Sequence, residues 1–71
     1  MSNPHDHRLL TLTFNGHRLR SNGYSLEGCR SMVSKAKGNP LVSAVTIFDP
    51  DGIVVAHFIR ADPGAPLVEV V

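Results

Sequence analysis

The chain has 71 residues, of which 42% are hydrophobic and 18% are charged. Seven Lys and Arg against six Asp and Glu leave a formal net charge of +1, which argues against broad attraction to nucleic acid or acidic lipid. One cysteine cannot form an internal disulfide, and no apolar run reaches the ~18 residues of a membrane span. We therefore expect one small cytoplasmic domain over residues 1–71 without membrane contact.

The N-terminal third predicts a hairpin after a flexible polar segment over residues 1–7. Apolar and polar residues alternate over residues 8–14, which is the pattern of a half-buried strand. Asn15-Gly16 predicts a two-residue type I′ turn into a second strand over residues 17–20. Such a turn fixes the register, and this register places four polar residues on one face: Thr11, Thr13, Arg18 and Arg20.

The middle of the chain predicts a single helix over residues 26–37. Ser21-Asn22-Gly23 is expected to end the second strand, and Ser25 is a suitable N-cap because its hydroxyl can accept from a free backbone amide. Five residues of this segment fall on one apolar side at helical spacing: Leu26, Cys29, Met32, Val33 and Ala36. Gly38 is expected to end the helix in the left-handed conformation.

A second hairpin is predicted over residues 41–60. Asp49-Pro50-Asp51-Gly52 suits a type I turn followed by a left-handed glycine, which sets Asp49 opposite Ile53. Regular pairing from that point predicts one face with Leu41, Val45, Ile47, Val55, His57 and Ile59, and another with Val42, Ala44, Phe48, Val54, Ala56 and Phe58. Residues 61–66 are expected to form a connector, and residues 67–71 a terminal strand or a swapped arm.

The predicted fold is therefore α+β with the order ββαββ, an antiparallel sheet of four to five strands with one helix packed on one face. A three-turn helix covers only one face of the sheet, so roughly four large side chains on the other face stay exposed to water. Leaving them exposed loses ~6–12 kcal/mol of hydrophobic stabilisation. We expect a homodimer to cover them, through Val45, Ile47, Val55, His57, Ile59, Val68 and Val70. The alternative is that the first hairpin folds over the second and hides both faces within a monomer.

The polar face of the first hairpin is the candidate binding site. Arg18 and Arg20 lie ~7 Å apart on one side of a strand and can straddle a phosphate or carboxylate, with Thr11 and Thr13 as further donors. Tyr24 can stack on a bound ring or pack against the first turn of the helix as a hydrophobic staple. The competing interpretation is a solvated strand face that discourages aggregation at the sheet edge.

Other polar residues have structural explanations. His57 suits a hydrogen-bonded structural histidine or a pH-sensitive interfacial group, Cys29 a small buried hydrophobe, and Asp49 and Asp51 turn residues. We predict no catalytic residue, metal site or cofactor. The sequence favours a small protein-binding regulator or inhibitor of a larger macromolecule over an enzyme. The alternative is binding or sequestration of a phosphorylated small molecule, such as a nucleotide, or of nucleic acid.

Overall fold

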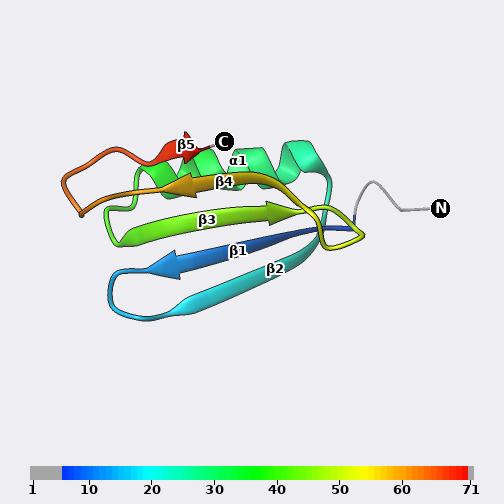
Figure 1. Ribbon diagram of the computed structural model, residues 1–71, viewed down its shortest axis with the longest axis horizontal. Helices are drawn as coiled ribbons and strands as arrows, with labels where there is room; N and C mark the ends of the chain where they lie inside the picture. The colour runs from blue at the N-terminus through cyan, green and yellow to red at the C-terminus, as the bar shows by residue number, and fades with distance from the viewer. Residues whose placement is uncertain (1–5, 71) are drawn as a thin grey trace.

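The computed structural model describes residues 6–70, which form a five-stranded antiparallel sheet with one helix on one of its faces (Figure 1). The strands follow the order β2-β1-β3-β4-β5 across the sheet. Their bounds are β1 His7–Thr13, β2 Arg18–Tyr24, β3 Val42–Phe48, β4 Val54–Ile59 and β5 Val68–Val70, and the helix α1 spans Leu26–Lys37. The predicted α+β fold is confirmed. The flexible segment predicted over residues 1–7 lies largely outside the described residues.

The β1–β2 turn has one residue more than the sequence predicted. The Thr13 amide donates to the His17 carbonyl (3.0 Å), and the Thr13 carbonyl accepts from the Gly16 amide (3.1 Å). Of the turn residues, Gly16 alone takes a positive φ, of 88°. This is a type I turn followed by a left-handed glycine, not the type I′ turn that we expected. The register therefore moves by one residue: Leu12 pairs with Arg18, and Leu10 with Arg20. A shift of one residue turns the side chains of one strand to the other face relative to its neighbour.

Strand β2 also runs further than predicted, because Ser21-Asn22-Gly23 does not end it. Ser21 pairs with Leu9 and Asn22 with Arg8, so the ladder with β1 continues to Tyr24. Gly23 is the extra residue of a bulge and has a φ of 81°. The hydrogen bonds to β1 outweigh the low strand propensity of this tripeptide.

The β3–β4 turn is confirmed, but the register beyond it is not. Asp49 donates to Ile53 (2.8 Å) and accepts from Gly52 (2.9 Å), whose φ is 84°. Phe48 pairs with Val54 as predicted, whereas Ile47 pairs with Ala56 because Val55 forms a second bulge. Val45 consequently lies opposite Phe58 instead of His57, and the two predicted faces of this hairpin are wrong beyond the bulge.

Helix α1 begins and ends where the sequence predicts. Gly28 donates its amide to the Ser25 hydroxyl (3.0 Å), which confirms the N-cap. Cys29 and Val33 are buried against the sheet, with Met32 and Ala36 packed around them, whereas Leu26 is partly exposed. The core consists of Leu9, Cys29, Val33, Val42, Val45, Ile47, Ala56, Phe58 and Leu67.

The C-terminus of α1 is closed by a side chain rather than by a left-handed glycine. Gly38 has a φ of −82°, so its predicted conformation is wrong. Arg60 is buried, and its Nη1 and Nη2 donate to the carbonyls of Asn39 (2.5 Å) and Lys37 (3.0 Å). A cation at the negative end of the helix dipole satisfies carbonyls that a left-handed turn otherwise satisfies.

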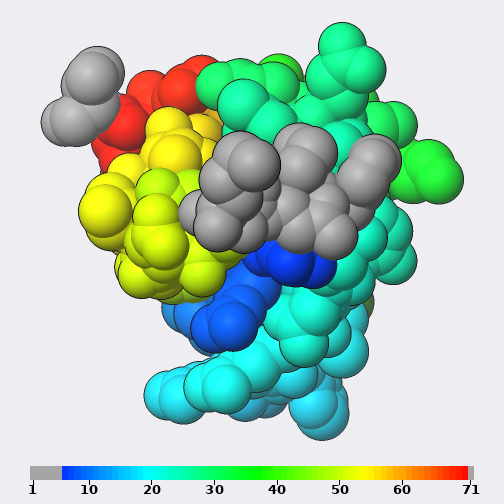
Figure 2. Space-filling view, turned by 90° about the vertical axis from the view of Figure 1, so that its right-hand side faces the viewer, coloured from blue at the N-terminus to red at the C-terminus, as the bar shows by residue number. Residues whose placement is uncertain are grey.

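The two hairpins lie side by side in one sheet, since β1 pairs with β3, so neither folds over the other. Strand β5 pairs with β4 of its own chain. Figure 2 views the molecule from one end, with α1 (green) on one side and the β3–β4 turn (yellow) bent toward the other. Among the described residues, no element covers the second face of the sheet.

Candidate functional site: the uncovered sheet face

Three rows of paired residues cross the uncovered face. In antiparallel pairs, directly opposite residues lie on the same side of the sheet, so the register defines each row. The rows are Asn22, Arg8, Phe48 and Val54; Arg20, Leu10, Thr46, His57 and Val70; and Arg18, Leu12, Ala44, Ile59 and Val68. The intervening residues, such as Leu9, Ile47 and Phe58, lie beneath α1.

The half of this face on β3–β5 is apolar. We call it the apolar patch, and it comprises Ala44, Phe48, Val54, Ile59, Val68 and Val70. Val54 is 52% exposed, Ile59 41% and Val68 47%. The other three are partly exposed. Burial of the exposed parts of these side chains would add hydrophobic stabilisation that the single chain does not gain.

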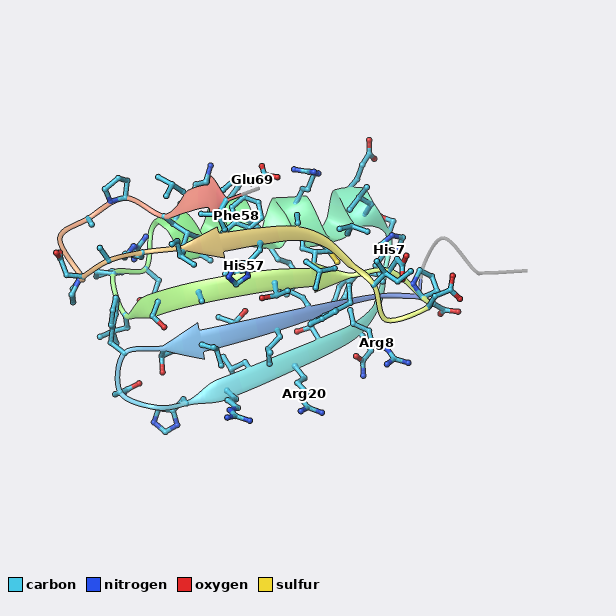
Figure 3. All side chains as sticks on the ribbon, viewed as in Figure 1. His7, Arg8, Arg20, His57, Phe58 and Glu69 are labelled. Atoms are coloured by element: carbon cyan, nitrogen blue, oxygen red, sulfur yellow. The ribbon has the colours of Figure 1, made fainter. Side chains whose placement is uncertain are left out.

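Two polar side chains lie within the apolar patch and satisfy each other. Thr46 Oγ1 and His57 Nδ1 are 2.8 Å apart across β3 and β4. His57 lies near the middle of the sheet and both side chains are partly buried (Figure 3). This arrangement matches the hydrogen-bonded structural histidine that was one of the two interpretations of His57.

The other half of the face, on β1 and β2, carries arginines. We call Arg8, Arg18 and Arg20 the arginine edge. All three are exposed, and Arg18 and Arg20 belong to an outer strand of the sheet. Charged residues at an exposed edge discourage pairing with another strand, so they also protect β2 from aggregation.

The predicted cluster of threonines and arginines does not form. Thr11 pairs with Leu19 on the helix side, and Thr13 lies at the turn, where its hydroxyl accepts from the His17 amide (3.0 Å). Arg18 and Arg20 lie on the opposite side with Leu12 and Leu10. The physical reason is the extra turn residue. It shifts the register by one residue, so the threonines of β1 and the arginines of β2 point to opposite faces of the sheet.

Tyr24 is separated from the arginine edge as well. It pairs with His7, and a Cβ at Gly28 would lie 3.6 Å from the Tyr24 ring. The ring therefore borders the first turn of α1, as the staple interpretation expects.

The predicted dimer residues fall into different environments. Val45 and Ile47 are fully buried beneath α1, so they cannot contact a partner of the folded chain, which is a correction to the predicted face. Val55 is the bulge residue of β4 and is exposed. The residues that share the uncovered face are His57, Ile59, Val68 and Val70.

The uncovered face has a strong asymmetry of charge. Its three rows contain three arginines and no aspartate or glutamate. The ion pair found among residues 6–70 joins Arg30 of α1 to Glu69 of β5 at 3.9 Å, away from the arginine edge. Within these residues, no carboxylate forms an ion pair with Arg8, Arg18 or Arg20.

A hollow of ≈ 370 Å³ lies at one end of the arginine edge. It is lined by Arg8, Leu9, Leu10, Arg20, Asn22, Phe48 and Gly52. Figure 2 shows β1 (blue) recessed between the β3–β4 turn (yellow) and β2 (cyan). Figure 3 shows the side chains of Arg8 and Arg20 leaving adjacent strands in a similar direction. Sequence reasoning missed Asn22 and Phe48 as lining residues, because only the extended β2 and the pairing of β1 with β3 bring them beside Arg8.

Further residues singled out in the sequence have structural roles. Burial raises the pKa of the Cys29 thiol, which disfavours the reactive thiolate. Asp49 Oδ1 accepts from the amides of Asp51 and Ile53, both at 2.9 Å, and so holds the turn. No three His, Cys, Asp or Glu side chains of residues 6–70 gather into a possible metal site. Likewise, no helical segment in this range has the length and hydropathy needed to span a bilayer.

Comparison with known protein families, curated proteins and solved structures finds no match to this chain.

Proposed function

We propose that this chain is a small homodimeric binding protein that regulates or inhibits a larger macromolecule by occupying it. The supporting observation is the apolar patch on β3–β5, in which Val54 and Ile59 of β4 and Val68 of β5 are half-exposed on the uncovered face. In this proposal a second copy covers the patch, and the two helices face outward, where their polar sides are available to the larger partner.

A second copy suits the patch because the patch carries no formally charged side chain. Two copies related by a two-fold axis bring the same surface together, and an uncharged surface meets no like charge in its twin. The arginine edge lies at the periphery of this contact. That division, with an apolar centre and a charged rim, is the usual anatomy of a protein interface.

The expected affinity follows from the exposed apolar area. Complete burial of a Val or Ile stabilises by ~1.5–3 kcal/mol, so the half-exposed Val54, Ile59 and Val68 offer ~2–4 kcal/mol per copy and ~4–8 kcal/mol for two. Association itself costs at least ~4 kcal/mol. Ala44 and Val70 add ~1–2 kcal/mol per copy, so the sum less the cost of association centres near ~5 kcal/mol. This corresponds to a weak dimer with a Kd of about 0.1 mM.

Sedimentation from about 1 µM to about 1 mM protein brackets such a Kd and tests the proposal. We expect the mass to rise from the 7.7 kDa of one chain to twice that value. Ile59→Asp with Val68→Asp should leave a monomer throughout, because a carboxylate buried in a dry interface is strongly unfavourable. Leu19→Asp is the matched control, since Leu19 is 61% exposed but lies on the helix side. A wild-type chain that stays monomeric at the highest concentration refutes the dimer.

A further inference from the structure

The hollow on the arginine edge has the composition of an anion site. Asn22 and Arg8 are directly paired across β2 and β1, and Arg20 is the diagonal neighbour of Arg8. Diagonal neighbours on one face are ~7–8 Å apart, which leaves room for one tetrahedral anion between two guanidinium groups. Guanidinium forks match phosphate oxygens in geometry as well as in charge.

The charges around the hollow are not balanced within the described chain. Arg8 and Arg20 have no carboxylate partner among residues 6–70, although they lie on adjacent strands with like charge. The bordering turn carries two acids: Asp49, whose Oδ1 accepts from two backbone amides, and the exposed Asp51, and neither forms an ion pair with Arg8 or Arg20. A phosphate placed between the two arginines relieves their repulsion and forms charge-assisted hydrogen bonds.

The hollow also offers a surface for a flat ring. Phe48 pairs with Arg8 on the side away from β2, so an aromatic ring borders the anion site, and Gly52 of the turn closes that end. Aromatic side chains stack on nucleobases of any sequence. Asn22 supplies an amide that both donates and accepts hydrogen bonds. The volume of ≈ 370 Å³ lies within the range of small-ligand sites.

From these observations we infer that the hollow binds a nucleotide unit, with the phosphate held between Arg8 and Arg20 and the base against Phe48. The inference goes beyond the proposed dimer and does not depend on it. The apolar patch lies on β3–β5, and a two-fold axis near Ile59 and Val68 joins that end of the patch in two copies. Phe48 is at the opposite end of β3, so it stays open beside β1 and β2. The same chemistry is available from a free nucleotide or from one nucleotide of a single strand.

Amide NMR of the full chain, titrated with adenosine 5′-monophosphate, inorganic phosphate or adenosine, tests the site residue by residue. We expect the monophosphate to shift the amides of Arg8, Asn22 and Phe48 and to bind more tightly than phosphate or adenosine alone. Arg8→Gln with Arg20→Gln should weaken binding at least ~10-fold, as expected when charge-assisted hydrogen bonds are lost. Arg30→Gln with Lys35→Gln removes the same charge from the exposed side of α1 and should change affinity less than ~2-fold, the scale of an unspecific charge effect.

Phe48→Leu separates stacking from phosphate binding. It should weaken binding of the monophosphate at least ~5-fold, the lower end of base stacking on an aromatic ring, and leave inorganic phosphate unaffected. A short single-stranded oligonucleotide that binds more tightly than the monophosphate identifies a strand as the source, and equal affinity identifies the free nucleotide. The inference fails if millimolar monophosphate shifts none of these amides, or if the helix double variant loses as much affinity as the arginine double variant. Both outcomes are independent of whether the chain sediments as a dimer.

Discussion

Replacing Arg60 by Met tests whether the buried guanidinium holds the end of α1 in place. Arg60 Nη1 and Nη2 donate to the carbonyls of Asn39 (2.5 Å) and Lys37 (3.0 Å), while its Nε is buried without a hydrogen-bond partner. Met has a similar length and no donors, so it fills much of the space and leaves both carbonyls without the guanidinium. The effect on stability is therefore mainly electrostatic and not a matter of cavity volume.

The loss of stability in Arg60→Met is the difference between two free energies: the hydrogen bonds that are lost and the desolvation cost of Nε that is removed. Two hydrogen bonds from a charged donor contribute ~3–6 kcal/mol, and removal of the unpartnered Nε returns ~1–3 kcal/mol of its desolvation cost. The balance centres on ~2–3 kcal/mol of lost stability. A 71-residue chain has a total of only ~4–11 kcal/mol at ~0.05–0.15 kcal/mol per residue. The variant should therefore lose a large share of its free energy of unfolding.

Urea unfolding followed by circular dichroism, at one fixed protein concentration because self-association adds stability, measures this loss. With a slope of ~1 kcal/mol per molar urea, the midpoint should fall by ~2–3 M. Arg30→Met is the control: its ion pair with Glu69 spans 3.9 Å between half-exposed side chains, so the midpoint should move by less than ~0.5 M. An Arg60→Met midpoint as close to wild type as the control refutes the argument.

Three further predictions use the same measurement. Gly38→Ala should be neutral or stabilising by up to ~1 kcal/mol, because the φ of Gly38 is −82°. Gly52→Ala should cost ~1–2 kcal/mol, because the φ of Gly52 is 84°. Equal effects of the two substitutions would contradict this difference in backbone conformation. Ser25→Ala should cost ~1 kcal/mol by removing the acceptor of the Gly28 amide, and an unchanged midpoint means that the cap contributes nothing. Burial raises the folded pKa of Cys29 above 9.0, so the unfolded chain ionises first and the free energy of unfolding falls as pH rises above 9.0. Cys29→Ala should have a shallower decline over that range, and identical slopes in the two proteins contradict it.

The local elements of the fold were predictable because short segments of sequence determine them. Ser25 as N-cap and the apolar spacing over residues 26–37 indicate the bounds of the helix, which match the prediction. The β3–β4 turn was equally predictable, because Asp49, Pro50 and Gly52 each favour one position of one turn type.

The candidate site was not predictable to the same degree, because it depends on register. One additional residue in the β1–β2 turn turns Arg18 and Arg20 away from Thr11 and toward Leu10 and Leu12. Asn15-Gly16 favours the type I′ turn that we predicted, but it is also compatible with a type I turn followed by a left-handed glycine, which the chain adopts. Continued pairing of β2 with β1 then brings Asn22 beside Arg8, although Ser21-Asn22-Gly23 has the composition of a break.

The sequence by itself determined that this chain contains two hairpins, one short helix and more apolar strand surface than that helix can cover. These properties depend on residues near each other in the chain, through caps, turn residues and side-chain periodicity. The tertiary structure decided which apolar residues are buried, since the bulge at Val55 sends Val45 and Ile47 beneath α1 and leaves Ile59 uncovered. It also decided that Arg60, 21 residues from Asn39, closes the helix. Register and long-range hydrogen bonds are fixed only when distant strands pair, and for that reason the candidate binding surface could be located only in the folded chain.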